Sequence, residues 1–222
     1  MASGRIVVIA GGDLTQTELD FIQPETDFII SADAGAVQLE KAGLLPNLAV
    51  GDFDTTGIAY MEELQKKGVQ VLSLPQEKAF TDMHFALNCA VRQKPGEILI
   101  LGALGGARFD HTLANVGLLE WLDEQGIKAA IVNRTNRLQL ITGPGKTVFS
   151  AIHFKYVSLI PVSKTVSGIY TDGLKYKLSH ESLIRGETRG ISNELLKVPA
   201  VVSIERGICL VVESRDRICR QN

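Results

Sequence analysis

Two aspartates one residue apart are the feature of this sequence whose spacing most directly suggests chemistry. Asp52 and Asp54 follow a short apolar run that ends at Gly51. In an extended segment residues i and i+2 share a face, so the two carboxylates can converge while Phe53 points the other way. Such a pair suits a hard cation like Mg2+, which proteins use to handle polyphosphates. An ordinary solvated turn after a strand is the alternative.

Two more aspartates stand at predicted junctions between strands and helices. Asp33 follows the strand expected at 27–32, and Asp82 stands at the start of a predicted helix. Each also has a structural explanation, Asp33 as a helix N-cap and Asp82 as a first-turn acid that meets the helix dipole. Thr81 fits the N-cap of the same helix, and Lys78 fits a solvated loop lysine as well as a phosphate ligand.

A glycine-rich loop follows the strand expected at 97–102 and leads into a helix. It contains Gly105 and Gly106, and Arg108 follows after Ala107. Backbone N–H groups at a helix N-terminus bind anions, and a guanidinium presents a fork of donors to phosphate oxygens. The loop is therefore a candidate phosphate cradle.

These residues need a scaffold that brings strand ends together, and the chain up to Asn136 has the pattern of one. Short apolar runs predict strands at 5–10, 27–32, 47–51, 69–73, 97–102 and 128–132. Amphipathic runs predict helices at 17–22, 34–43, 58–68, 82–94 and 110–125. This alternation indicates an α/β fold, a wound and mainly parallel sheet with flanking helices. Because such sheets bind ligands outside the carboxyl ends of their strands, we expect one polyphosphate and metal site there.

From Thr147 onward the helical periodicity disappears, and β-rich runs separated by turn signals predict an antiparallel β-sandwich or barrel. Two hairpins are expected, 168–171 with 174–178 and 201–204 with 208–212. The glycines and proline of 142–146 mark the predicted boundary. They divide the chain into domains 1–142 and 143–222.

Bulk properties narrow the classes of partner and location. The chain has 222 residues, 45% of them hydrophobic, and a net charge of -2. Without a basic surplus, we expect neither a nucleic acid nor a membrane partner, and a small molecule instead. The apolar run 6–10 is too short for a signal peptide or a membrane span. Cys89, Cys209 and Cys219 form no disulfide or zinc pattern, so a cytoplasmic location is expected.

The ordered motifs resemble those of the thiamin pyrophosphokinase family. The stretches that carry the resemblance in the first part are 31–36, 51–55, 78–82 and 102–115. In the β-rich part, 171–176 and 190–193 resemble the thiamin-binding domain of that family. The resemblance covers nearly the whole chain, and the order and spacing of the motifs make it specific.

The resemblance implies an activity and an assembly. The domain 1–142 would be the ATP-binding catalytic domain, and 143–222 the thiamin-binding domain. With Mg2+, the enzyme would transfer a pyrophosphoryl group from ATP to the hydroxyethyl arm of thiamin, which gives thiamin diphosphate and AMP. It would be a homodimer whose active site lies at the subunit interface.

The resemblance also implies roles for residues, carried over by position. The acidic catalytic set would be Asp33, Asp52, Asp54 and Asp82, of which the last three would hold the metal. The nucleotide-binding set would be Lys78, Thr81, Gly105, Gly106, Arg108, Asp110 and His111, although His111 is equally explained as a helix-start residue. Ser192 and Asn193 would approach thiamin. Two departures are Ala79, where many relatives carry an acidic residue, and Ala107, which lengthens the glycine loop.

Other functions fit parts of this pattern. A diphosphokinase for another hydroxymethyl heterocycle, such as a pterin, would need the same nucleotide site, and the thiamin-like motifs of the β-rich part argue against it. A glycosyltransferase would also use Asp-x-Asp with a metal, but Thr81-Asp82 and the glycine loop argue against one. A sensing module without turnover would not need the acidic set. The sequence leaves the general base open among Asp33, Asp82 and Asp110.

Overall fold

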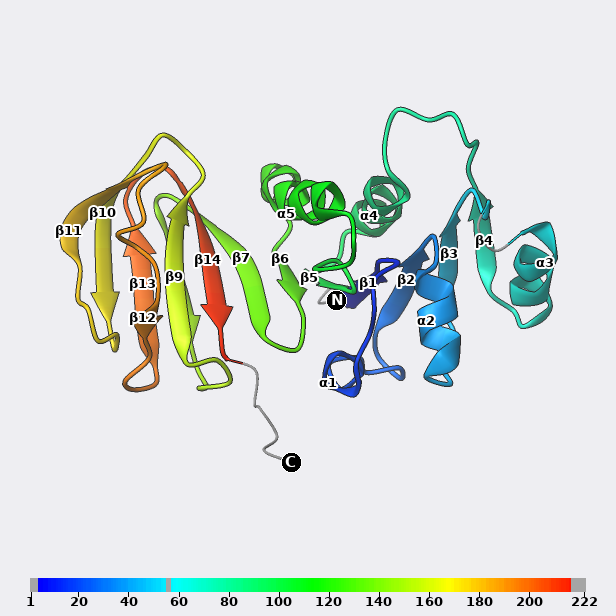
Figure 1. The fold of residues 1–222 in the computed structure, drawn as a ribbon, viewed down its shortest axis with the longest axis horizontal. Helices are drawn as coiled ribbons and strands as arrows, with labels where there is room; N and C mark the ends of the chain where they lie inside the picture. The colour runs from blue at the N-terminus through cyan, green and yellow to red at the C-terminus, as the bar shows by residue number, and fades with distance from the viewer. Residues whose placement is uncertain (1–3, 55–56, 217–222) are drawn as a thin grey trace. The chain divides into compact units, whose positions relative to one another are not determined.

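The computed structural model describes residues 4–54 and 57–216 (Figure 1). The chain divides into two compact units, Met1–Arg134 and Thr135–Asn222. This division falls before the predicted boundary at 142/143, because residues 136–142 form a strand that pairs with 208–214 of the second unit. Thr55 of the Asp-x-Asp motif and Cys219 lie outside the described residues.

The first unit is an α/β unit built on a parallel sheet with strand order β6-β5-β1-β2-β3-β4. The strands are β1 (Arg5–Ile9), β2 (Phe28–Ala32), β3 (Leu48–Gly51), β4 (Gln70–Ser73), β5 (Glu97–Leu101) and β6 (Ala129–Val132). Each of them overlaps a predicted strand. The carboxyl ends of all these strands therefore lie along one edge of the sheet.

Five predicted helices are also present, as α1 (Gln16–Leu19), α2 (Gly35–Lys41), α3 (Ile58–Lys66), α4 (Asp82–Arg92) and α5 (Phe109–Glu124). In α4, Thr81 is the N-cap, and its Oγ1 accepts a hydrogen bond from the backbone N–H of His84 at 3.3 Å. This confirms the structural role predicted for Thr81. The cap fixes where the helix begins and so where Asp82 lies.

Alternation along the strands builds a core on both faces of this sheet. Val7 and Ile9 of β1 pack with Ile22 and Leu39 in one cluster. The helix α4 packs against β1, β2 and β3, and α4 and α5 lie opposite α1 and α2 (Figure 1). The strand order reverses between β1 and β5, which is where ligands bind in doubly wound sheets.

The second unit is an antiparallel β unit with two layers. One layer has the order β12-β9-β14-β7 and the other the order β11-β10-β13-β8. The strands are β7 (Asn136–Thr142), β8 (Gly145–Phe149), β9 (Tyr156–Pro161), β10 (Thr165–Asp172), β11 (Ser179–Ile184), β12 (Asn193–Glu194), β13 (Ala200–Ile204) and β14 (Ile208–Ser214). Buried residues from both layers form one apolar cluster. The predicted antiparallel sandwich is confirmed.

Both predicted hairpins are wrong in their pairing. The strand β10 pairs with β11, which begins at Ser179. Of the predicted second strand, Leu178 accepts a hydrogen bond from the Thr171 N–H at 3.0 Å, whereas the Lys175 N–H donates to the Glu194 carbonyl at 2.9 Å. The strands β13 and β14 both exist, but they pair within different layers. Residues 205–207 thus connect the two layers and do not close a hairpin.

Among the described residues, no helix is both long enough and apolar enough to cross a bilayer.

Candidate active site

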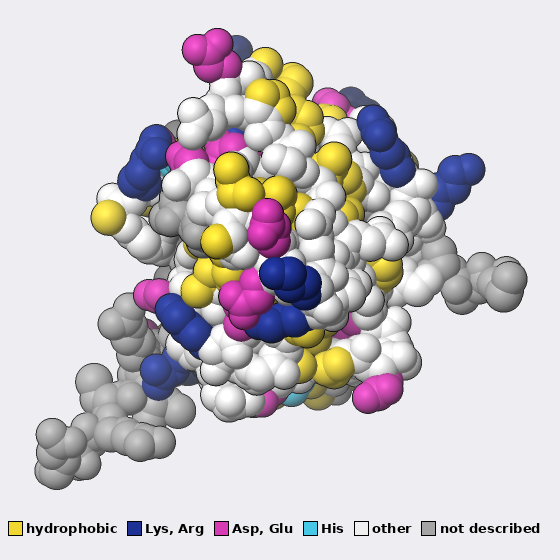
Figure 2. Space-filling model, turned by 90° about the vertical axis from the view of Figure 1, so that its right-hand side faces the viewer, with side chains coloured by type: hydrophobic (Ala, Val, Ile, Leu, Met, Phe, Trp, Pro, Cys, Tyr) yellow, Lys and Arg dark blue, Asp and Glu magenta, His cyan; other side chains and the backbone are white. Residues whose placement is uncertain are grey.

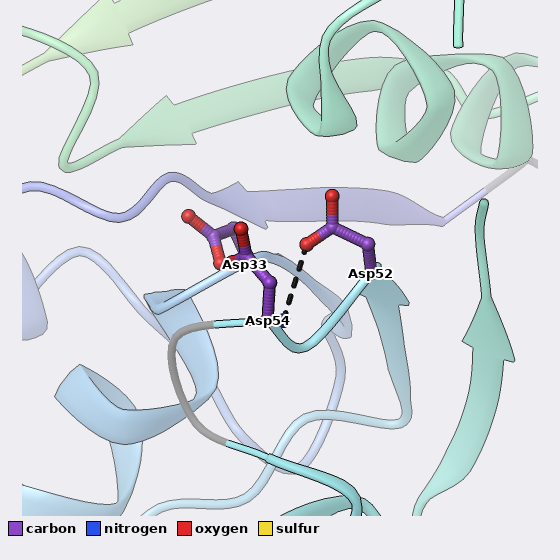
Figure 3. Close-up of side chains that lie close together, drawn as sticks. All are labelled: Asp33, Asp52 and Asp54. Atoms are coloured by element: carbon purple, nitrogen blue, oxygen red, sulfur yellow. Dashed lines mark hydrogen bonds between the residues drawn. The ribbon is translucent and has the colours of Figure 1, made fainter. Parts of the chain in front are cut away.

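Three carboxylates meet at the carboxyl edge of the parallel sheet. Asp33, Asp52 and Asp54 each offer an oxygen, and these oxygens all lie within 4.8 Å of one another. Figure 3 shows the three side chains grouped beyond the ends of their strands. The chain therefore brings together the Asp-x-Asp pair and the aspartate that follows β2, as the strand-end argument predicts.

The Asp-x-Asp pair converges through a turn and not through an extended strand. The strand β3 ends at Gly51, and Phe53 adopts a left-handed backbone with φ of 55°. The Asp54 N–H donates to Asp52 Oδ1 at 3.3 Å, which is the dashed line in Figure 3. Phe53 is buried in an apolar cluster with Leu64 and its neighbours. Burial of Phe53 thus fixes the turn that presents both carboxylates.

Asp33 is placed by a backbone conformation and not by a capping role. Its φ is 49°, and its N–H donates to the Val50 carbonyl at 2.9 Å. The two strand ends approach closely here, because an added Cβ on Gly51 would lie 3.3 Å from the Cα of Asp33 and would push the two segments apart by a few tenths of an ångström. The N-cap of α2 is Ala34, so the N-cap explanation of Asp33 is wrong. Burial raises the pKa of Asp33, and the negative charges of Asp82, Asp52 and Asp54 raise it further. These four aspartates form the acidic rim of the site.

Lys78 lies between two of the acidic residues. Its Nζ donates to Asp52 Oδ2 at 2.5 Å and lies 3.2 Å from Asp82 Oδ1. The hydrogen bond from Lys78 lowers the pKa of Asp52, whereas burial raises the pKa of Asp82 despite the same ammonium. Burial alone would lower the pKa of Lys78, but its bonds to Asp52 and Asp82 raise it. At neutral pH this group is an ammonium held by two carboxylates.

The acidic residues fit a hard cation. Asp82 Oδ1 is buried and, within the described part of the chain, has no hydrogen-bond partner; Lys78 Nζ is at ion-pair distance but outside hydrogen-bond geometry. The Lys78 ammonium offsets part of the cost of burying this oxygen, and a bound cation would offset more. The donor atoms that the aspartates offer are carboxylate oxygens, which are ligands that Mg2+ prefers. The group whose oxygens lie within 4.8 Å of one another is Asp33, Asp52 and Asp54. These three suit the metal predicted from the sequence, and Asp82 is linked to Asp52 through Lys78.

A cavity of about 560 Å3 opens beside these carboxylates. Its lining includes Asp33, Asp82 and residues of the glycine loop. The remaining predicted residues that line it are Thr81, Gly105, Arg108, Asp110 and His111. The structure thus places most of the predicted nucleotide-binding residues around one space, of a size typical of small-molecule sites.

The glycine loop is anchored to α5 by two polar side chains. The Gly105 N–H donates to Thr112 Oγ1 at 3.2 Å, and Asn115 Nδ2 donates to the Ala103 carbonyl at 3.0 Å. Both Gly105 and Gly106 have positive φ, near 95° and 84°, which favours glycine. Thr112 and Asn115 were missed as functional residues. Their signal was their place one and two turns into the helix that follows the loop.

Arg108 and Asp110 stand at the open side of the cavity. Arg108 Nη2 donates to Asp110 Oδ2 at 2.8 Å, and both side chains are mostly exposed. The hydrogen bond from Arg108 lowers the pKa of Asp110. Ala107, which lengthens the loop, is exposed, as is Ala79 beside Lys78. Arg108 is thus available to a ligand if it leaves its partner.

The two residues predicted to approach thiamin differ in availability. Ser192 is exposed, with a left-handed φ of 59°, and its N–H donates to Ser158 Oγ at 3.0 Å. Asn193 is buried. Its Oδ1 accepts from the N–H of Tyr176 at 2.9 Å, and its Nδ2 donates to the Tyr176 carbonyl at 2.6 Å. The amide of Asn193 therefore holds the 174–178 segment in place.

The sequence matches two domain descriptions in succession. Residues 21–131 match "Thiamin pyrophosphokinase, catalytic domain", and residues 146–209 match "Thiamin pyrophosphokinase, vitamin B1 binding domain". The chain belongs to the thiamin pyrophosphokinase family. This membership confirms the family resemblance, the fold class and the assignment as an enzyme, a thiamin diphosphokinase.

Relatives from Bacillus subtilis and Geobacillus thermodenitrificans match over almost their whole length. A thiamine pyrophosphokinase of Bacillus subtilis (strain 168) is 31% identical over 212 residues, which cover 95% of this chain and 99% of the relative. A crystal structure of the Bacillus subtilis enzyme has a TM-score of 0.85 at 30% identity and covers 96% of this chain and 99% of the other. For thiamin pyrophosphokinase from Geobacillus thermodenitrificans the TM-score is 0.84 at 35% identity, with 97% and 99% covered.

Proposed function

We propose that this thiamin diphosphokinase uses the carboxyl edge of its α/β unit to transfer a pyrophosphoryl group from ATP to the hydroxyl of thiamin, releasing AMP. One observation supports this placement. The cavity between the carboxylates of Asp33 and Asp82 and the glycine loop is of small-molecule size and lies where doubly wound sheets bind nucleotides. A polyphosphate there would meet acidic metal ligands on one side and Arg108 on the other.

The metal in this proposal is Mg2+, held by Asp52, Asp54 and Asp82 with Asp33 beside them. When bound, Mg2+ neutralises phosphate oxygens and orients the group that is transferred. Two observations support this metal: the buried Asp82 Oδ1 accepts no hydrogen bond from the described residues, and oxygens of Asp33, Asp52 and Asp54 lie within 4.8 Å of one another.

The protein's own residues bind and orient the reactants. Lys78 and Arg108 supply positive charge to phosphate oxygens, Arg108 as a two-pronged donor. Gly105 and Gly106 keep the loop backbone close to the phosphates, and Thr112 holds that loop against α5. Substitutions at these positions that leave the fold intact are expected to raise the KM for ATP.

The proton of the attacking hydroxyl goes to a rim carboxylate in this proposal. Asp33 and Asp82 have raised pKa values because both are buried, so each holds a proton better than an ordinary aspartate. Asp110 has a lowered pKa because of Arg108. Asp33 and Asp82 line the cavity and are partly buried, whereas Asp110 is 64% exposed and paired with Arg108, so we favour Asp33 or Asp82 as the general base.

We propose that thiamin contacts the exposed Ser192. The buried Asn193 would position the site indirectly, because its amide holds the Tyr176 backbone. The family resemblance further suggests a homodimer in which the α/β unit of one subunit and the β unit of its partner share an active site.

We also propose a cytoplasmic location, in keeping with the unbridged Cys89 and Cys209. Figure 2 shows basic side chains intermingled with acidic ones on the face it presents, which favours small-molecule partners over nucleic acid.

One assay tests the reaction. The protein is incubated with ATP, Mg2+ and thiamin, and AMP and thiamin diphosphate are followed by chromatography. AMP and thiamin diphosphate in equal amounts are expected, and ADP in place of AMP would overturn pyrophosphoryl transfer. A hydroxymethyl pterin offered in place of thiamin should give no AMP above background. Gel filtration with a light-scattering detector tests the dimer.

A further inference from the structure

Lys78 is enclosed to a degree that is unusual for a loop lysine. Its side chain is 10% exposed, and its two carboxylate partners, Asp52 and Asp82, are 12% and 18% exposed. Asp52 lies in the turn after β3, whereas Lys78 and Asp82 lie four residues apart where the chain enters α4. The ammonium therefore joins two structural elements at the edge of the sheet.

The charge balance of the rim explains why the ammonium lies there. Asp33, Asp52 and Asp54 offer oxygens within 4.8 Å of one another, and like charges at this separation repel strongly where water is partly excluded. Arg108 does not relieve this repulsion, because it pairs with Asp110 and is 69% exposed. Lys78 contacts two of the rim carboxylates, Asp52 and Asp82.

We infer that Lys78 is a built-in counter-ion of the acidic rim, which holds Asp52 and Asp82 in place in the free enzyme and gives up Asp52 when a divalent cation binds. This inference rests on the proposed metal role of the rim. A divalent cation competes with the ammonium for the same carboxylate. The ammonium that loses Asp52 is then able to contact a phosphate oxygen of the nucleotide. Lys78 is thus a positioning residue before the nucleotide binds and a phosphate ligand afterwards.

The test measures divalent binding with and without ATP, with Mn2+ as the probe and electron paramagnetic resonance to count free Mn2+. Without ATP, Lys78→Met should bind Mn2+ about tenfold more tightly than the wild type, or about 1.4 kcal/mol, because the competing charge is gone. With ATP present, the same variant should bind Mn2+ about tenfold more weakly, because the phosphate ligand is gone. If Lys78 only stabilised the fold, the change in Mn2+ affinity in Lys78→Met would not have opposite signs with and without ATP.

Two variants control this experiment. Lys78→Arg keeps the charge, so its Mn2+ affinity without ATP should stay close to that of the wild type. Lys67 also bridges two carboxylates, Glu40 and Glu63, but it follows the end of α3, and helices of a parallel sheet end at the edge away from the rim. Lys67→Met should therefore leave Mn2+ binding unchanged in both conditions. If Lys78→Met is not folded by circular dichroism, Lys78→Gln replaces it.

The outcomes separate this inference from the proposed function. Suppose that the wild type binds Mn2+ and that Asp54→Asn abolishes this binding. If Lys78→Met then binds Mn2+ without ATP no more tightly than the wild type, Lys78 is not a counter-ion that competes with the metal, and the proposed metal site is unaffected. If Lys78→Met binds Mn2+ more tightly both with and without ATP, the counter-ion role is supported, but the inferred contact between the Lys78 ammonium and a phosphate oxygen is wrong. Absence of Mn2+ binding in the wild type and in the Lys78→Met variant overturns the metal site and the counter-ion together.

Discussion

The two cations near the cavity, Lys78 and Arg108, differ in how far the fold encloses them. The Lys78 side chain is 10% exposed, against 69% for Arg108. Lys78 pairs with Asp52, which lies in the turn after β3, and with Asp82 four residues along, whereas Arg108 pairs with Asp110, two residues away in the first turn of α5. An enclosed pair between segments constrains the fold, and an exposed local pair is screened by water and salt. Lys78 therefore organises the rim, and Arg108 is free to move to a ligand.

The largest expected effect comes from removing the carboxylate that the enclosed cation contacts most closely. Asp52→Asn should lower kcat/KM for AMP formation by more than about 100-fold, since even groups that only orient a metal ligand are typically worth 10–100-fold. The fold should persist by circular dichroism. Asp20→Asn, an exposed change at the end of α1, is the matched control and should keep full activity. Activity of Asp52→Asn within a few-fold of the wild type would remove Asp52 from the metal site.

Stability should separate the two cations. Lys78→Met leaves enclosed carboxylates without their counter-ion, and we expect the free energy of unfolding to fall by about 1–3 kcal/mol, somewhat less than for a fully buried pair. Arg108→Met should leave the urea unfolding midpoint unchanged, because its pair is exposed. Both are measured at pH 7 and low salt without divalent ions. Equal losses of stability in the two variants would contradict the distinction between an organising and a free cation.

The pH dependence of stability should show the charge repulsion between the rim carboxylates. The pKa of Asp33 is raised in the fold, so its contribution to stability is present below the unfolded pKa of about 3.9 and is lost as pH rises through the folded pKa. Asp33→Asn keeps the shape and tolerates the left-handed backbone. It should melt at a higher temperature than the wild type at pH 7, and the difference should vanish below about pH 4. A difference independent of pH would exclude relief of charge repulsion.

The sequence predicts the strands and helices of the α/β unit well, because their apolar periods are unambiguous. It also predicts that Asp33, Asp52 and Asp54 meet, since the carboxyl ends of parallel strands share an edge. It does not predict how they meet. The turn depends on Phe53 entering an apolar pocket with a left-handed backbone, and a period-two argument contains no such information.

The β unit is predicted less well, for a different physical reason. Runs of strand-forming residues identify β13 and β14 but not their partners, which lie in different layers. Segment 174–178 has the composition of a strand, yet its backbone is held by the side chain of Asn193, far along the sequence. Long-range hydrogen bonds of this kind leave no local pattern, so Asn193 is read from sequence only as a residue that approaches thiamin.

The smallest expected effect belongs to the partner of the exposed cation. Asp110→Asn releases Arg108 from its pair and should change the KM for ATP by at most about fivefold, as for other exposed pairs. Raising the ionic strength should abolish this change, because the Debye length falls from about 30 Å at 0.01 M to about 3 Å at 1 M. The loss in Asp52→Asn should persist at high salt, since that carboxylate is enclosed. A loss of more than tenfold in Asp110→Asn that survives high salt would mean that Asp110 contacts the nucleotide itself.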